Sequence, residues 1–255
     1  MTEAFKKPHH DIEREHLQHR LAAIDRDPAK LQDLLRELYG SASENPHVFY
    51  AAATHLTSLM FLERRTQADH IVLPDSQDAG RAFAAYTQLL AMLHTEKNSP
   101  LYIGDSRVRR RLTGSREELA FHASLTYATA HGADFVALPT PASVDFRGAE
   151  DASDVQIFFA GAEEADLEIQ VKFGASKNSY HPRIAVLGLE AALGERAKAS
   201  ELRDTLMQAS KLADGSEGVT LPRREHAIVM DGAAAIMKAT YDWGTAGNQE
   251  VAKAA

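Results

Sequence analysis

The stretch Leu167–Phe173 (LEIQVKF) has a strict alternation of apolar and polar residues, and it decides how the rest of the chain is interpreted. A β-strand places successive side chains on opposite faces. Glu168, Gln170 and Lys172 would therefore share one face, while the four apolar residues pack on the other. The alternation predicts a half-buried strand that presents a carboxylate, an amide and an ammonium group side by side.

A second apolar run, Val155–Ala160 (VQIFFA), precedes this strand, and a short polar segment, 161–166, separates the two. This spacing predicts a hairpin whose two strands pair antiparallel. Asp154 stands at the mouth of the earlier strand. Pairing through the hairpin would bring Asp154 close to Gln170 and Lys172.

Further upstream, Ser115-Arg-Glu-Glu118 has the pattern of a capping box and predicts that a helix opens there. The helix is expected to end at Gly132 and to be followed by a strand at Phe135–Leu138. Glu118 would lie in the first turn of this helix. We expect it to approach the polar face of the later strand.

Downstream of the alternating stretch, the pattern predicts a strand, a helix, a strand and a final helical stretch, at Ile184–Leu189, 195–212, 227–230 and up to Trp243. We expect 227–230 to close the core sheet and 184–189 to be an added strand. The order of elements over 115–243 is typical of a mixed α/β (α+β) domain. Residues 244–255 are expected to form a flexible tail.

The first part of the chain, residues 1–97, has helical patterns only and predicts a bundle of helices. Asp27-Pro28 begins one helix and Gly40 ends it. Three more are expected, over 12–24, 46–65 and from Asp78 onward. The segment between the two regions, 98–114, is expected to be a basic linker, with four arginines at Arg107, Arg109, Arg110 and Arg111.

Composition excludes several classes of protein. The chain has 255 residues, of which 44% are apolar and 25% charged, and it has no cysteine. A disulfide scaffold, a thiol nucleophile and an iron–sulfur cluster are thereby excluded. A net charge of −8 argues against a protein that coats nucleic acid without specificity. Because no apolar leader or spanning segment is visible, we expect a soluble, cytoplasmic protein.

The polar residues of the two paired strands suit metal-assisted cleavage of a phosphodiester. Carboxylate and carbonyl oxygens are hard ligands for Mg²⁺. A lysine on the same face would stabilise the charge that develops on a phosphate. The order helix, strand, Asp154 opening a second strand, then Gln170-Val171-Lys172 on a third, resembles the PD-(D/E)xK nuclease superfamily. The variant with glutamine in place of the second acid is similar to restriction endonucleases that cut modified DNA.

The resemblance covers roughly residues 115–175, and it implies a restriction-endonuclease-like sheet, a magnesium cofactor, a DNA substrate and possible homodimers. By the resemblance, Asp154 and Glu118 are metal ligands, with Glu117 as the neighbour of interest. Gln170 would be a neutral ligand, Lys172 the charge stabiliser and Glu168 a reserve carboxylate.

Two features depart from the family pattern. Ser153 stands where a proline is usual, and Asp145 competes with Asp154 as the first acid. Another interpretation also fits the residues: the polar face is the ordinary outer face of an antiparallel strand. The protein would then be an inactive nuclease-like or unrelated α+β module, an interaction or inhibitor protein that binds a basic partner.

Weaker candidates lie elsewhere in the chain. The arginine run at 107–111 could contact phosphates, and Lys177 could extend a basic groove. His16 and His19 have a spacing that can bind zinc on a helix, although such pairs are usually plain surface residues. His181 could activate water, but the proline after it favours a turn.

Overall fold

The computed structural model describes residues 28–39, 46–62, 71–95, 106–140, 153–172, 184–212 and 220–254, together with residues 20 and 23. Within this part of the chain it has seven helices and four strands. In order they are α3 (Pro28–Tyr39), α4 (Pro46–Phe61), α5 (Ser76–Thr95), α7 (Ser106–Ala130), β1 (Phe135–Pro139), β2 (Val155–Phe159), β3 (Leu167–Val171), β4 (Ile184–Leu187), α9 (Leu189–Leu193), α10 (Arg196–Ala209) and α11 (Arg223–Ala254). The predicted mixed α/β class is confirmed.

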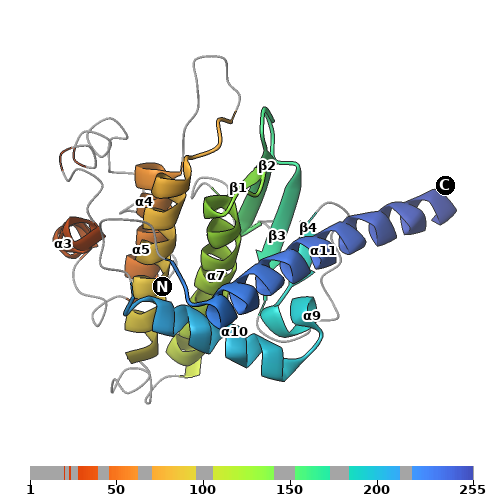
Figure 1. The fold of residues 1–255 in the computed structure, drawn as a ribbon. Helices are drawn as coiled ribbons and strands as arrows, with labels where there is room; N and C mark the ends of the chain where they lie inside the picture. The colour runs from red at the N-terminus through yellow and green to blue at the C-terminus, as the bar shows by residue number, and fades with distance from the viewer. Residues whose placement is uncertain are drawn as a thin grey trace.

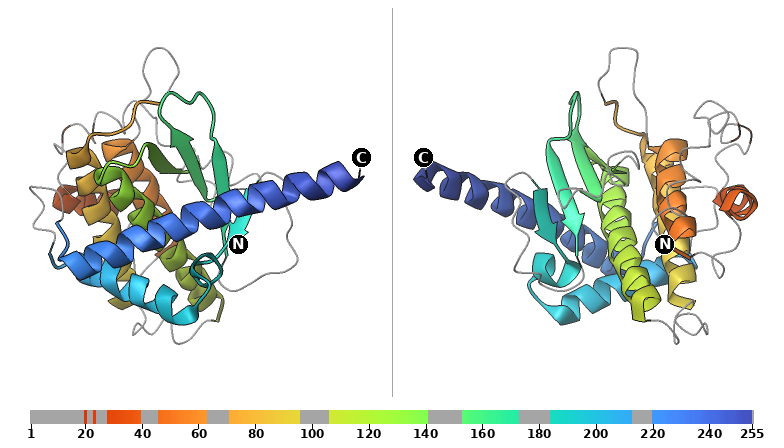
Figure 2. Two further views of the ribbon diagram at one scale, coloured as in Figure 1. Left: turned by 45° about the vertical axis from the view of Figure 1, so that its right-hand side comes forward. Right: turned by 180° about the vertical axis from the view of Figure 1, so that it is seen from behind.

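The elements are arranged in layers, with α7 between the α4–α5 pair and the sheet (Figures 1 and 2). Helices α7 and α11 pack against each other and both contact β3, so they lie on one face of the sheet. One continuous apolar core joins the layers, from Leu35 in α3 through Phe83 and Leu125 to Ile157 and Ile236. The N-terminal helices therefore share their core with the sheet.

The four strands form one sheet in the order β1-β2-β3-β4. Strands β1 and β2 pair antiparallel, as do β2 and β3, and β3 pairs parallel with β4. The predicted hairpin is thus present. Gly161 takes a left-handed φ of 81° in its loop, and Asp166 closes the loop by accepting a hydrogen bond from the backbone N–H of Phe159 at 2.8 Å.

The prediction for the closing strand was wrong. Strand β4, expected to be an added strand, is the one that pairs with β3, whereas residues 227–230 lie inside α11. The physical reason is visible in the burial of Val229, Ala233 and Ile236, which are spaced at helical intervals and are all buried. The four apolar residues at 227–230 are one turn of this helix, which continues to Ala254 through the segment expected to be a flexible tail.

The predicted start of the helix before β1 was also wrong. Helix α7 begins at Ser106, so residues 106–114 of the expected linker are helical and the arginine run lies in the helix. The Ser115–Glu118 pattern is therefore inside a helix, where the backbone N–H groups already have partners, and it caps nothing. Glu118 is not in a first turn.

The C-terminal helix crosses α10 at close range. A Cβ atom at Gly232 of α11 would come within 2.8 Å of Leu202 Cδ2 of α10, so a larger residue there would require the Leu202 side chain to shift. Beyond the crossing, α11 projects away from the rest of the molecule (Figure 1). None of the helices in the described ranges has the length and apolar character needed to cross a membrane.

Candidate functional site

Asp154 is fixed against the end of β3 by two hydrogen bonds. Its backbone N–H donates to the carbonyl of Ile169 at 2.8 Å, and its carboxylate Oδ2 accepts from the backbone N–H of Val171 at 2.6 Å. Val171 lies between Gln170 and Lys172 in the chain. The structure therefore brings Asp154, Gln170 and Lys172 to the same end of the β2–β3 pair.

Strand register puts these residues on one face. Val155 pairs with Ile169 and Gln156 with Glu168, and the side-chain amide of Gln156 donates to Glu168 Oε1 at 2.8 Å. Since faces alternate along each strand, Gln156 shares a face with the polar residues of β3. Asp154, one residue before β2, continues this alternation, but its carboxylate turns to the backbone of β3. The residues between them point the other way and are buried; they are Val155, Ile157, Ile169 and Val171.

The polar residues of this face form a narrow stripe along β2 and β3, which we call the polar stripe. All are half-buried, and they are Asp154, Gln156, Glu168, Gln170 and Lys172. On β4, the register partners of Glu168 and Gln170 are Ile184 and Val186, which are apolar and buried. Within the β2–β3–β4 part of the described sheet, the polar groups of this face thus lie along β2 and β3, and Glu168 there is already bonded to Gln156.

The two glutamates of α7 face different neighbours. Half-buried Glu118 acts electrostatically on Tyr86 of α5, and burial together with this carboxylate raises the pKa of the Tyr86 hydroxyl. Glu117 is buried and pairs with Arg203 of α10, Nη1 to Oε1 at 3.2 Å. Because α5 and the sheet lie on opposite sides of α7, the position of Glu118 does not favour the role that the resemblance implies.

The carboxyl group of Glu117 has a shifted pKa. Burial raises its pKa, Arg203 and Arg116 oppose that rise, and Glu190 at the start of α9 adds to it. Its second oxygen, Oε2, is buried and has no hydrogen-bond partner. Glu190 lies in the first turn of α9, the helix that directly follows β4.

Several candidates cannot be placed. Helix α7 carries the arginine run at 107–111, but the side chains of residues 106–112 are not described. The remaining candidates lie outside the described residues, and they are Asp145, Lys177, His16, His19 and His181.

Sequence reasoning missed a group of buried polar side chains between α4, α5 and α7. The hydroxyls of Thr57, Tyr86 and Thr126 and both ring nitrogens of His122 are buried without hydrogen-bond partners. His122 stacks on Tyr86, with ring centroids 5.4 Å apart. Burial lowers the pKa of His122 to about 3, so the ring is neutral. The spacing of Glu118, His122 and Thr126, one turn apart, is the signal that could have revealed this shared helix face.

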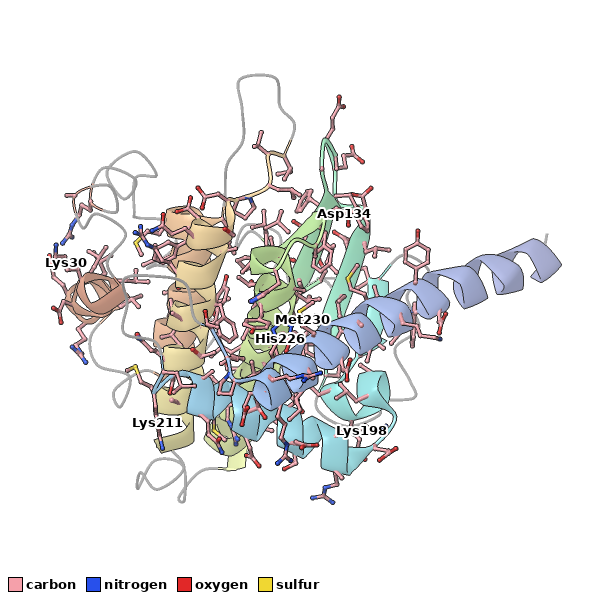
Figure 3. All side chains as sticks on the ribbon, in the orientation of Figure 1. Lys30, Asp134, Lys198, Lys211, His226 and Met230 are labelled. Carbon is pink, nitrogen blue, oxygen red and sulfur yellow. The ribbon has the colours of Figure 1, made fainter. Side chains whose placement is uncertain are left out.

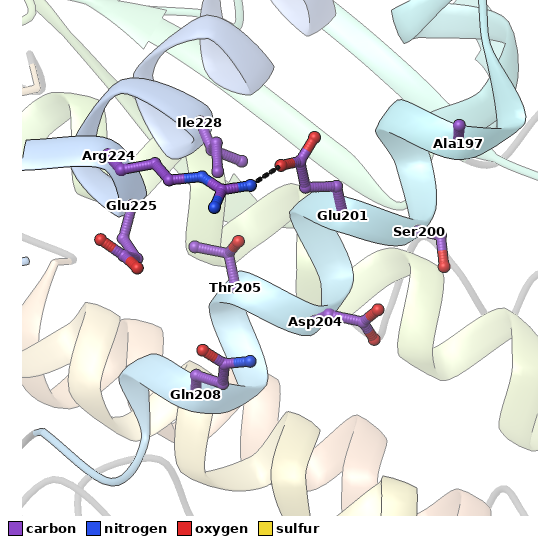
Figure 4. Close-up of a pocket in the computed structure, with 9 residues that line it drawn as sticks. All are labelled: Ala197, Ser200, Glu201, Asp204, Thr205, Gln208, Arg224, Glu225 and Ile228. Carbon is purple, nitrogen blue, oxygen red and sulfur yellow. Dashed lines mark hydrogen bonds and ion pairs between the residues drawn. The ribbon is translucent and has the colours of Figure 1, made fainter.

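A groove of about 390 Å³ lies between α10 and α11 (Figure 4). Its charged lining is mostly acidic, with Glu201, Asp204 and Glu225 against one cation, Arg224. Arg224 Nη2 donates to Glu201 Oε1 at 3.0 Å. Thr205 at its floor is only 7% exposed. This groove is on the α10–α11 side of the molecule and shares no lining residue with the polar stripe.

Within the described ranges, no three His, Cys, Asp or Glu side chains are grouped closely enough to hold a metal ion. Comparison with protein-family models, with curated proteins and with solved structures returned no match for this chain.

Proposed function

We propose that the protein is a metal-dependent nuclease that hydrolyses phosphodiester bonds in DNA. The observation that carries this proposal is the hydrogen bond between the Asp154 carboxylate and the N–H of Val171, at 2.6 Å. It holds the carboxylate at the end of the antiparallel strand pair, against the backbone of the residue between Gln170 and Lys172. The order helix, β1, β2, β3, with Asp154 opening β2, is also the order on which the resemblance to PD-(D/E)xK nucleases rests.

The chemistry of the donor groups fits magnesium. Asp154 and Gln170 offer a carboxylate and an amide oxygen on one face, and oxygen donors are what Mg²⁺ takes. We assign the holding of the ion to Asp154 and Gln170, with water completing the coordination. When bound, Mg²⁺ would polarise the phosphate and acidify a water molecule.

The remaining polar residues would orient the phosphate and neutralise its negative charge. Lys172 is anchored by its backbone N–H, which donates to the carbonyl of Leu187 at 2.9 Å, so its half-buried side chain starts from a fixed point. Its ammonium group would stabilise negative charge on the phosphate. Glu168, held by Gln156, is better suited to fixing the face than to binding a metal. A homodimer would supply two such sites for the two strands of duplex DNA.

The experiment that tests this function is cleavage of plasmid, linear, single-stranded and base-modified DNA with Mg²⁺ or Mn²⁺, against the same reactions in EDTA. We expect cutting only with metal. We also expect the protein to act in the cytoplasm, as its lack of cysteine suits. No cutting of any of these substrates, nor of RNA, would contradict the proposal.

A second candidate function rests on the acidic groove between α10 and α11 (Figure 4). Of its three acids, Glu201 is the one that accepts a hydrogen bond from Arg224, and the other two are Asp204 and Glu225. Such a lining suits a basic partner, and the protein would then be an interaction or inhibitor module. Binding of a lysine- or arginine-rich peptide that is weakened by Asp204→Asn, together with inactivity on nucleic acid, would favour this role.

A further inference from the structure

The groove between α10 and α11 has an excess of negative charge. Its lining includes three carboxylates, from Glu201 and Asp204 on α10 and from Glu225 on α11, and the one cation of this lining is Arg224. Arg224 Nη2 donates to Glu201 Oε1 at 3.0 Å, so the guanidinium is held against that carboxylate (Figure 4). The charged groups of the lining thus leave two negative charges without a balancing cation.

Other cations on or beside α10 do not supply that balance. Arg203 pairs with Glu117 of α7 at 3.2 Å, and Lys198 pairs with Glu195 at 3.0 Å. Figure 3 shows Lys198 near one end of α10 and Lys211 near the other. None of these three cations belongs to the lining of the groove. The excess negative charge is therefore left for a ligand that brings positive groups of its own.

Thr205 adds a hydroxyl group at the floor of the groove. The residue is only 7% exposed, and its side chain points into the groove between the two helices (Figure 4). Buried threonines of other helices donate to a carbonyl of their own helix, as Thr129 does at 3.1 Å and Thr240 at 2.8 Å. Within the described part of the chain, the Thr205 hydroxyl has no hydrogen-bond partner. Because an unpartnered hydroxyl in a buried residue costs free energy, it indicates a ligand that forms hydrogen bonds.

The spacing of the carboxylates suits an extended cation and not a single metal ion. No three His, Cys, Asp or Glu side chains in the described ranges are close enough to share an ion. Figure 4 shows Glu201 and Asp204 on one side of Thr205 and Glu225 on the other. Ile228 adds apolar surface against which methylene groups can pack. The groove volume of about 390 Å³ lies within the range of small-molecule sites.

We propose that this groove binds a linear aliphatic polyamine, a flexible chain of methylene groups with two or more protonated amino groups. One ammonium group would donate to Asp204 and another to Glu225, and the Thr205 hydroxyl would accept a hydrogen bond between them. This ligand is a narrower choice of the basic partner in the second candidate function, on which it rests. It is independent of nuclease activity, since the groove shares no residue with the polar stripe.

The test is titration of the full chain with 1,4-diaminobutane and with spermidine at low ionic strength, followed by the NMR shifts of backbone amides. We expect the shifts to concentrate on the residues of α10 and α11 that line the groove. The monoamine n-butylamine should bind about 2–5-fold more weakly than the diamine, because it forms one charge contact fewer. Magnesium chloride at the same concentration should not displace the diamine. Equal binding of n-butylamine, displacement by Mg²⁺, or no shifts at the groove would overturn the proposal.

Paired variants separate the groove from the negative charge of the whole protein. Asp204→Asn and Glu225→Gln should each weaken diamine binding about 2–5-fold, whereas Glu163→Gln, at an exposed carboxylate between β2 and β3, should leave it unchanged. Arg224→Met removes the opposing cation and should strengthen binding about 2–5-fold. Lys238→Met changes the net charge by the same amount outside the groove and should have no effect. Equal effects of a groove variant and its control would overturn the proposal.

Thr205→Val tests the hydroxyl, because valine keeps the shape of the side chain and removes its hydrogen-bonding group. Diamine affinity should fall about 2–10-fold. Unchanged affinity in the folded variant would overturn the contact with Thr205. A lysine-rich peptide that binds the groove while both amines do not would overturn the polyamine proposal and leave the second candidate function standing. The DNA-cleavage assay reports on the nuclease separately.

Discussion

The carboxylate of Asp154 accepts a hydrogen bond from the backbone N–H of Val171 at 2.6 Å, just beyond the last residue pair of the β2–β3 ladder. The side chain does here what a backbone carbonyl does inside a ladder: it satisfies a donor on the neighbouring strand. One carboxylate therefore has a structural role and a proposed chemical role. Experiments on this residue must separate the two.

Comparison of Asp154→Asn with Asp154→Ala measures the structural role, because it tests how much the hydrogen bond to Val171 stabilises the fold. Asparagine keeps an acceptor oxygen for the N–H of Val171, whereas alanine leaves it without a protein partner. We expect Asp154→Ala to lower the free energy of unfolding by about 1–3 kcal/mol and Asp154→Asn to lower it by clearly less. Urea unfolding of the two variants and the wild type measures this. Equal losses in both would mean that the bond contributes little.

The buried pair Glu117–Arg203 should be important for stability. Side-chain exposures of 4% for Glu117 and 17% for Arg203 leave little solvent screening. Arg203→Met removes the cation and leaves a buried carboxylate, so we expect a loss of about 3–5 kcal/mol at neutral pH. The matched control is Arg224→Met. Its ion pair with Glu201 is exposed, so it should cost less than about 1 kcal/mol.

The Arg203→Met loss should also depend on pH. Burial already raises the pKa of Glu117 above its ordinary value, and removal of Arg203 would raise it further. A carboxyl whose pKa is higher in the folded state binds protons preferentially there, so stability falls as pH rises from its unfolded pKa to its folded pKa. The deficit of Arg203→Met should therefore shrink when unfolding is measured at pH 5 instead of pH 7. A constant deficit would show that the carboxylate is not the cause.

We expect His122 to lower the stability of the folded protein, and we expect an apolar residue at this position to raise it. Both ring nitrogens are buried without partners, and the folded-state pKa of about 3 lies well below that of an exposed histidine. Since only the unfolded state takes up the proton, stability should fall as pH drops from about 6.5 toward 3. We expect His122→Leu to raise the free energy of unfolding by about 1–3 kcal/mol and to flatten this part of the pH profile. Urea unfolding of the wild type and His122→Leu at pH 7.5 and pH 5 tests both the gain in stability and its pH dependence. A variant that is less stable than the wild type, and that loses as much stability between the two pH values, would contradict the account.

Local patterns were sufficient for most of the fold. The strand β3 and its hairpin with β2 were predicted correctly. The two strands are close in the sequence, and one face of β3 is apolar while the other is polar. The helices at 28–39 and 196–209 were also predicted, from a proline start and apolar spacing. These signals depend on neighbours within one or two turns, which a sequence displays directly.

The errors have a common physical origin. Four apolar residues at 227–230 suit a buried strand or one turn of a buried helix, and only packing against α7 and α10 decides between them. The Ser115–Glu118 pattern resembles a cap but lies inside α7, because a helix continues wherever neighbouring helices bury its apolar face. For the site, register explains why Asp154 meets Gln170 and Lys172. The surroundings of Glu117 and Glu118 depend on helix packing, which no short pattern encodes.

The most direct test of the central claim is metal-dependent DNA cleavage by Lys172→Met and Asp154→Asn. Both changes preserve side-chain size, and Asp154→Asn also preserves an acceptor for Val171. The matched control is Lys238→Met, because Lys238 is an exposed lysine on α11 that is paired with Asp242. We predict that the wild type and Lys238→Met cut DNA with Mg²⁺, whereas both site variants lose at least about 100-fold of the rate while remaining folded, as expected when a group that stabilises transition-state charge is removed. Undiminished cutting by folded Lys172→Met and Asp154→Asn would contradict the account.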